Sequence, residues 1–175
     1  QGEIVLKAGT VLRPSEIGIL ASLGRDIVEV IRRPVVAVID TGDELLEPGE
    51  PPSPGKIYNS NGYSVSASIL RYGGIPRFLG IARDNLESLG AKLEEGLDAD
   101  LLITSAGVSK GDFDIVKDLL ADRGEIAFWS VRMRPAKPLA FGAFQGPTGK
   151  RIPHVGLPGN PVSALVAFEE LVRPA

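Results

Sequence analysis

The sequence predicts an α/β fold: a three-layer sandwich in which a mostly parallel, mixed sheet lies between two layers of helices. A continuous apolar run at residues 35–39 and a second run at residues 100–104, apolar at its three central positions, are typical of strands buried on both faces. Segments with helical periodicity separate the strands up to residue 104, which indicates parallel strands joined by crossover helices. The strands expected after residue 125 follow one another more closely, which indicates a mixed edge to the sheet.

Residues 1–34 form a leading segment, which we expect to be the tail of a preceding domain. A short helix is predicted to begin at Pro14 and to end at Gly24. The alternating residues 27–30 predict a strand. The main α/β domain is then expected to occupy residues 35–175.

Three helices of this domain are expected to be capped by Asn61, Asp84 and Asp114. The Asn160–Pro161 pair is typical of an N-cap followed by the first helical residue, so it predicts a last helix that ends near Leu171. This helix reaches the end of the sequence, and we therefore expect the chain to be part of a longer protein. The predicted strands are residues 35–39, 78–81, 100–104, 126–133, 139–144 and 152–157.

Composition excludes several classes of protein. A net charge of −3 argues against a generic binder of nucleic acid or of an anionic membrane. The absence of cysteine excludes a disulfide scaffold and a cysteine nucleophile, and the single histidine, His154, excludes a site with several histidine ligands. No apolar run approaches the roughly 20 residues of a membrane helix, so we expect a cytoplasmic protein. We expect His154 to be structural or at the surface, and Phe128 and Trp129 to pack in the core.

The loop at residues 105–114 follows a buried strand and precedes a capped helix. In an open α/β sheet, ligands bind outside the carboxyl ends of the strands. Glycines and hydroxyl side chains there can present backbone N–H groups to an anion. The structural alternative is an ordinary connection between a strand and a helix, and the sequence alone leaves both interpretations open.

Asp43 and Glu44 directly follow the first buried strand. Two carboxylates at a strand's carboxyl end can hold a divalent cation through their oxygen atoms. Asp84, Asp112 and Asp114 recur near the same predicted edge of the sheet. Helix capping and solvation of the loop are the alternatives, and they fit Asp84 and Asp114 well.

A cationic stretch lies near the end of the chain. Between Glu125 and Glu169 no acidic residue occurs, although the chain average would place about five there. Arg134 and Lys137 lie three residues apart in a proline-rich loop, and both side chains suit oxyanions. The turn at residues 156–163 enters the last helix, where Ser163 can donate a hydrogen bond. This pattern favours an anion-binding face, with chance and an ordinary helix cap as the alternatives. The cations of the stretch are Arg132, Arg134, Lys137, Lys150 and Arg151.

Five segments together resemble one family. They are TGDELLEPG, PGKIYNSNGYSV, SAGVSKGDFD, FWSVRMRPAKP and GLPGNPVSAL, in this order. In sequence and spacing they resemble the molybdenum-insertase family, which includes MoeA and the gephyrin E domain. The resemblance spans nearly the whole chain and implies a molybdopterin-binding-domain-like fold.

The resemblance also implies an activity. Members of the family insert molybdate into adenylylated molybdopterin and release AMP, with Mg²⁺ as cofactor. They are longer chains that form homodimers, with a molybdopterin adenylyltransferase as a possible partner. It further implies that Asp43, Asp114 and Lys137 take part in the reaction and that Asp43 and Glu44 serve the metal. The implied binding residues for the pterin nucleotide and molybdate are Ser105, Gly107, Ser109, Gly111, Asp114, Arg134, Lys137, Pro138 and Ser163.

Four positions depart from the family pattern. Ala106 and Ala136 stand where glycine is usual, so a positive φ at either position would be strained. Lys110 replaces an apolar residue, and Arg134 replaces a lysine.

Two other functions remain open: a non-catalytic module that holds molybdopterin or AMP, and a scaffold for other proteins. The isolated chain is expected to be inactive on its own.

Overall fold

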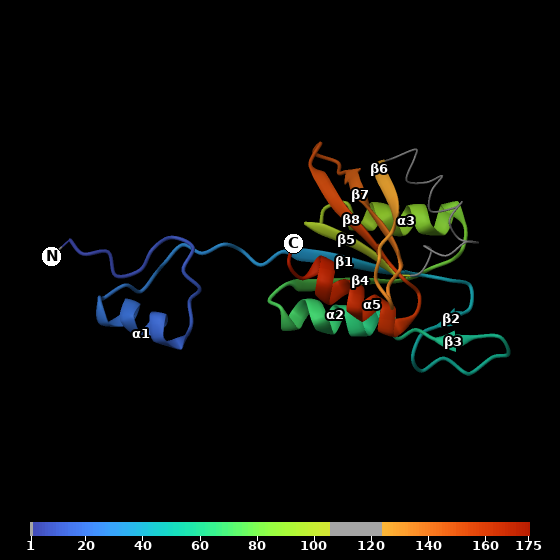
Figure 1. The fold of residues 1–175 in the computed structure, drawn as a ribbon, viewed down its shortest axis with the longest axis horizontal. Helices are drawn as coiled ribbons and strands as arrows, with labels where there is room; N and C mark the ends of the chain where they lie inside the picture. Colours follow the sequence, from blue (N-terminus) through green and yellow to red (C-terminus); the bar gives the residue numbers. More distant parts are fainter. Residues whose placement is uncertain (1, 106–123) are drawn as a thin grey trace. The chain divides into compact units, whose positions relative to one another are not determined.

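The structure, a computed structural model, describes residues 2–105 and 124–175 (Figure 1). The chain divides into two compact units, with the boundary between Arg32 and Arg33. The boundary lies close to the start of the predicted main domain.

The first unit contains one helix, α1 (Pro14–Ser22), which confirms the predicted helix. The Glu16 side chain accepts a hydrogen bond from the Arg13 backbone N–H at 2.9 Å and so caps its first turn. The strand predicted at residues 27–30 is wrong, because this segment is irregular. A strand needs a neighbour to pair with its backbone, and no described strand pairs with this segment; Ile27 is 81% exposed.

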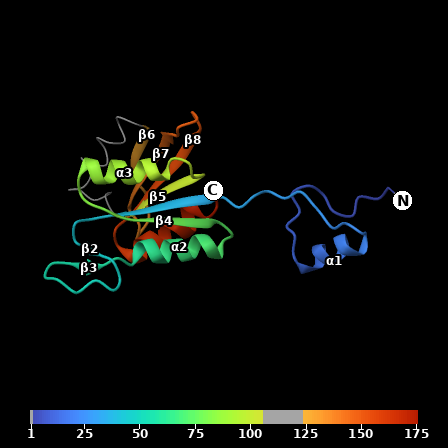
Figure 2. The ribbon, with the colours of Figure 1, turned by 180° about the vertical axis from the view of Figure 1, so that it is seen from behind.

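The second unit is built on a mixed sheet, as predicted (Figures 1 and 2). Within the described residues, its strand order is β4-β1-β5-β8-β7-β6. The first four of these strands pair in parallel, and β8, β7 and β6 pair antiparallel. The strands are β1 (Val35–Thr41), β4 (Ile75–Ala82), β5 (Leu101–Ser105), β6 (Gly124–Ser130), β7 (Pro138–Gln145) and β8 (Arg151–Leu157).

Helices cover both faces of this sheet. The helices α2 (Asn61–Arg71) and α5 (Pro161–Ala167) lie on one face, and α3 (Leu86–Gly96) lies on the other, as Figures 1 and 2 show from opposite sides. A turn of π-helix (Phe168–Val172) continues α5. Each face has its own core: Val65 and Ile69 of α2 join Ala164 of α5, and Leu89 and Leu93 of α3 pack on the opposite side.

Several local expectations need correction. Asn61 is the first residue of α2 rather than its cap, and Asn85 rather than Asp84 caps α3 by accepting the Ser88 N–H at 2.8 Å. Two short parallel strands, β2 (Leu45–Leu46) and β3 (Ile57–Tyr58), were not predicted, because each is too short to show a periodic pattern. Trp129 was expected in the core but is 57% exposed, since it lies on the outermost strand β6.

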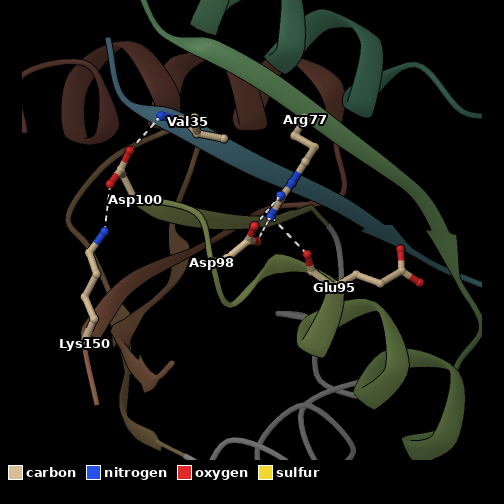
Figure 3. A network of polar contacts seen from close by, with 6 residues as sticks. All are labelled: Val35, Arg77, Glu95, Asp98, Asp100 and Lys150. Carbon is tan, nitrogen blue, oxygen red and sulfur yellow. Dashed lines mark hydrogen bonds and ion pairs between the residues drawn. The ribbon is translucent and has the colours of Figure 1, made fainter. Parts of the chain in front are cut away.

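Hydrogen bonds and ion pairs form a polar network near the starts of β1 and β5 (Figure 3). The Asp100 carboxylate accepts hydrogen bonds from the Val35 backbone N–H at 2.9 Å and from Lys150 Nζ at 2.8 Å. Beside it, Arg77 of β4 forms an ion pair with Asp98 and donates to the Glu95 carbonyl at 3.0 Å. The network therefore joins β4, β1, β5 and the turn before β8 at the amino end of the sheet.

His154 is fully buried in β8, so of the two expectations for this residue the structural role is the one that the fold supports, and a surface position is wrong. Its Nε2 lies 3.0 Å from Thr104 Oγ1 on the neighbouring strand, and its ring meets Phe144 edge to face. Burial lowers the pKa of His154 to about 3, so the imidazole is neutral at physiological pH.

The described helices, which lie within residues 2–105 and 124–175, are all too short or too polar to cross a lipid bilayer.

Gly62, in the first turn of α2, allows this helix to lie against β1 and β4. A Cβ at this position would come within 2.1 Å of Asp40 Oδ2 and 2.3 Å of Phe78 Cε2. We expect Gly62→Ala to lower the free energy of unfolding by about 1–3 kcal/mol, the usual cost of overpacking, as measured by urea denaturation. Gly18→Ala in α1 is the control: nothing lies within 4 Å of its position, so a helical alanine should be neutral or slightly stabilising. Equal effects of the two substitutions would contradict the close approach at Gly62.

Candidate functional site

The carboxyl ends of β1 and β5 form the point where the chain turns to opposite sides of the sheet. From β1 the chain continues through α2 to β4, which lies on one side of β1 in the sheet, and from β5 it continues to β6, which lies on the other side of β5. Ligands of open α/β sheets bind at such a point. Asp40 and Ser105 are paired in register there, so they mark the floor of the candidate site.

Asp40 is a buried carboxylate at this position, with 1% of its surface exposed. Its Oδ2 accepts a hydrogen bond from Asn59 Nδ2 at 2.8 Å. Burial raises the pKa of Asp40 from 3.8 to about 6, although hydrogen bonds, that of Asn59 foremost among them, oppose the shift. The floor of the site therefore contains an acid that titrates near neutral pH.

Asn61 joins the ends of two strands that lie next to each other in the sheet. Its Nδ2 donates to Ser105 Oγ, at the end of β5, and to the carbonyl oxygen of Gly159, just after β8, each at 2.8 Å. Asn61 and Ser105 are both buried. Both hydrogen atoms of one amide are thus used to hold two neighbouring loops at the same edge of the sheet.

A cationic pocket of about 710 Å³ lies beside this edge. One wall is the loop between β6 and β7, which the Val131 N–H closes by donating to the Lys137 carbonyl at 2.9 Å. The other wall is the turn between β8 and α5. The structure therefore brings together the two segments that sequence analysis proposed for an anion site. We call this the cationic pocket; its lining is Met133, Arg134, Pro135, Ala136, Lys137, Pro138, Pro158, Gly159, Asn160 and Ser163.

Ala136 shapes the loop that carries the two cations. Its φ is +75°, a value at which an alanine is strained. Its methyl group is buried and belongs to the core shared with α2 and α5. The side chain of Ala136 thus points into the core, while Arg134 and Lys137 are exposed on the same loop.

The start of α5 forms the opposite side of the pocket. The Asn160 side chain caps the helix as predicted, and its Oδ1 accepts the N–H groups of Val162 and Ser163, each at 3.1 Å. These N–H groups are therefore occupied. The Ser163 hydroxyl also donates to Asn160 Oδ1, at a longer distance of 3.4 Å. The pocket can therefore offer an anion the Arg134 guanidinium and the Lys137 ammonium, and a rotation of the Ser163 hydroxyl would add a third donor.

The five cations of the acid-free stretch do not form one face. Arg134 and Lys137 line the cationic pocket. Lys150 pairs with Asp100 and Arg151 pairs with Glu125, before and at the start of β8, whereas the pocket lies beyond the end of that strand. Arg134 and Lys137 thus lie at the cationic pocket, whereas Lys150 and Arg151 lie near the start of β8; that the pocket binds an anion stays a prediction.

The predicted metal ligands, Asp43 and Glu44, are both exposed after β1. The side chains of Asp43 and Asp84 each accept a hydrogen bond from the backbone of the other residue. Asp84 Oδ2 accepts the Asp43 N–H at 3.1 Å, and Asp43 Oδ1 accepts the Asp84 N–H at 3.3 Å. Across the part of the chain that the structure describes, no three acidic or histidine side chains lie together as a candidate metal-binding group.

Sequence reasoning placed four further site residues in a segment outside the described residues: Gly107, Ser109, Gly111 and Asp114. It missed Asp40, Asn59 and Asn61. A signal for them was present, because Asp40 interrupts a β-branched run and the two asparagines lie two residues apart just before a helix. Only the pairing of distant strands shows that these residues meet.

Comparison with known proteins gives a consistent result. Residues 37–175 match the family model described as "Probable molybdopterin binding domain". The chain is similar to the molybdopterin molybdenumtransferases of Nostoc sp. (43% identity) and Haemophilus influenzae (41%), with 99% of this chain covered in each case. It spans 40% and 42% of the length of these two relatives.

Solved structures show the same similarity. The crystal structure titled as molybdopterin biosynthesis MoeA protein of Pyrococcus horikoshii superposes with a TM-score of 0.83 at 35% identity, over 97% of this chain and 41% of that one. A CinA structure from Thermoplasma acidophilum, at 15% identity and a TM-score of 0.59, shows a shared fold alone.

The buried carboxyl group of Asp40 makes the free energy of unfolding fall as the pH rises. Its pKa in the folded chain is raised to about 6 from 3.8. The contribution of Asp40 to the free energy of unfolding is therefore fully present below about pH 4 and is lost as the pH rises through about 6. We expect wild type to lose about 2–3 kcal/mol relative to Asp40→Asn between pH 4 and pH 8, as measured by urea unfolding over that range. A difference between the two curves that stays the same from pH 4 to pH 8 would report only the packing of the amide and would contradict a raised pKa. Glu87→Gln, at an exposed position on α3, is the control.

Proposed function

Because this chain belongs to the molybdopterin-binding domain family, we propose that it is the domain of a molybdopterin molybdenumtransferase that binds molybdate and adenylylated molybdopterin. The enzyme inserts molybdate into the pterin dithiolene and releases AMP. The observation that carries this proposal is the cationic pocket, in which Arg134 and Lys137 form no ion pair with any described residue. An anion is the ligand that such a pair of cations binds best.

The electrostatics of the site fit this reaction. Molybdate is a dianion, and it must approach a nucleotide phosphate that is also negative, so the reaction requires positive charge between them. Lys137 supplies a point charge and Arg134 a planar fork that can bind two oxygen atoms. Ser163 adds a hydroxyl donor from the opposite wall. We place the nucleotide at residues 105–114, beyond the carboxyl end of β5, on the basis of the sequence alone.

We also propose that Asp43 and Glu44 hold Mg²⁺ near the phosphates, where the ion would neutralise their charge. The residues fit this role. The absence of a Cβ at Gly42 leaves room for the Glu44 carboxylate, whose Oε2 lies 2.6 Å from where that Cβ would be. Mg²⁺ commonly binds one or two carboxylates, several waters and substrate phosphates, so two exposed acids suffice without a larger cluster.

The whole protein is proposed to be a cytoplasmic homodimer, with a molybdopterin adenylyltransferase as the supplier of its adenylylated substrate. The relatives are more than twice as long as this chain. We therefore expect complete activity to need the full-length protein. The same length supports the proposal that residues 1–34 are the tail of a preceding domain.

Lys137 tests the cationic pocket. In the full-length protein we expect Lys137→Ala to lose molybdate-dependent AMP release yet to keep most nucleotide binding, because the loss of a charge-assisted hydrogen bond costs about 1.5–3 kcal/mol. Lys137→Arg should rescue poorly, since the guanidinium reaches differently. Steady-state assays over a range of molybdate concentrations, with calorimetry for AMP, measure both quantities.

Lys150→Ala is the matched control for Lys137→Ala. It removes a cation from the same acid-free stretch, but this cation pairs with Asp100 at the other end of the sheet. It should leave the molybdate dependence unchanged. Loss of nucleotide binding in Lys137→Ala with unchanged saturation by molybdate would move the oxyanion site elsewhere.

The metal proposal is tested with Mn²⁺ as a probe for Mg²⁺. We expect Asp43→Asn combined with Glu44→Gln to weaken Mn²⁺ binding in the presence of AMP by about tenfold or more, the effect usual for disturbed metal ligation. Electron paramagnetic resonance of free Mn²⁺ measures the change. Glu95→Gln, an exposed acid near the end of α3, is the control. If the double variant and the control bind Mn²⁺ equally, the two carboxylates are not ligands.

A further inference from the structure

We propose that Asn61 is a positioning residue that sets the rear wall of the cationic pocket. This inference rests on the proposed function and adds a residue that is not among those lining the cationic pocket. Asn61 acts through two backbone segments that it holds together: the end of β5 and the turn that follows β8.

The first step is the hydrogen bond to Gly159. This residue lies in the turn that lines the pocket opposite Arg134 and Lys137. Its carbonyl oxygen accepts the Asn61 amide at 2.8 Å. The next residue, Asn160, caps α5 and fixes the first turn that carries Ser163. A change in the position of Gly159 therefore changes the distance from Ser163 to the two cations.

The second step is the hydrogen bond to Ser105. This residue is fully buried at the end of β5, beside Asp40 in register. Ser105 Oγ accepts the same Asn61 amide at 2.8 Å. Asn61 thereby links the turn after β8 to the end of β5, an interior strand of the sheet.

The third step is the position of Asn61 itself. Asn61 is 8% exposed, and it opens a helix that Gly62 holds tightly against β1 and β4. An asparagine at the first helical position is not required for the helix, because its side chain makes no capping bond to α2. The fixed backbone leaves its amide aimed at two acceptors on two other segments. Neither a shorter donor nor an apolar side chain can serve both.

The experiment compares Asn61→Leu with wild type in the full-length protein. Leucine keeps the size of the side chain and removes both hydrogen bonds. We expect the KM for molybdate to rise about tenfold, the effect of losing roughly 1.4 kcal/mol of positioning, with a smaller change in kcat. Calorimetric affinity for molybdate without nucleotide should fall by a similar factor. Asn61→Ser, which keeps one hydroxyl donor, should be intermediate and supplies a second variant if the leucine variant does not fold.

Two control variants separate positioning from stability. Asn85→Ala removes the cap of α3 on the opposite face of the sheet, at a cost of about 1 kcal/mol of stability, and should leave the molybdate KM within about twofold. Ser105→Ala keeps the bond to Gly159 and should raise that KM less than Asn61→Leu does.

The outcomes are distinguishable. If wild type releases no AMP in response to molybdate but binds molybdate, and Asn61→Leu weakens that binding, the proposed function fails and the positioning role stands. If wild type is active and Asn61→Leu changes the molybdate KM no more than Asn85→Ala does, the positioning role is overturned and the function stands. If wild type neither binds nor uses molybdate, both are overturned.

Discussion

The close packing of the first turn of α2 against β1 and β4 is the constraint on which the site depends. It is possible because residue 62 has no side chain: a Cβ there would overlap the Asp40 carboxylate and the Phe78 ring. Asn59 and Asn61 lie just before this glycine in the chain, so their side chains reach the ends of β1, β5 and β8. Burial of Asp40 and its raised pKa follow from the same approach, because the helix excludes water from the carboxylate.

The two ends of the sheet use charge in different ways. At the amino end, cations are matched with acids: Lys150 with Asp100 and Arg77 with Asp98 (Figure 3). At the carboxyl end, Arg134 and Lys137 line a pocket without a described acidic partner. Paired charges of the first kind contribute modestly to stability. Two cations that line one pocket make its potential positive, and this attracts an anion.

Sequence reasoning predicted the layers of the fold, because buried parallel strands and amphipathic helices leave strong periodic patterns. It also brought Arg134, Lys137 and Ser163 to one pocket, since charge and proline content distinguish this stretch. It was wrong where the structure of a segment depends on which distant segments lie beside it. Residues 27–30 alternate correctly but have no described neighbouring strand, and Trp129 lies exposed because β6 is the outermost strand. Asn61 looks like a helix cap in sequence, and only its distant acceptors reveal what its amide does.

The change from parallel to antiparallel pairing at β8 has a consequence for folding. The strands β6, β7 and β8 are consecutive in the chain and pair as neighbours, whereas β8 reaches β5 only after two other strands have intervened. Local pairings close with less loss of chain entropy than distant ones. The loop after β6 and the turn after β8 thus belong to a segment that can assemble early. Pairing with the parallel half of the sheet, across β5 and β8, closes a longer loop and so costs more chain entropy. The walls of the cationic pocket thus belong to one run of consecutive strands and the turn after it, whereas the hydrogen bond that Asn61 donates to that turn comes from a distant part of the chain.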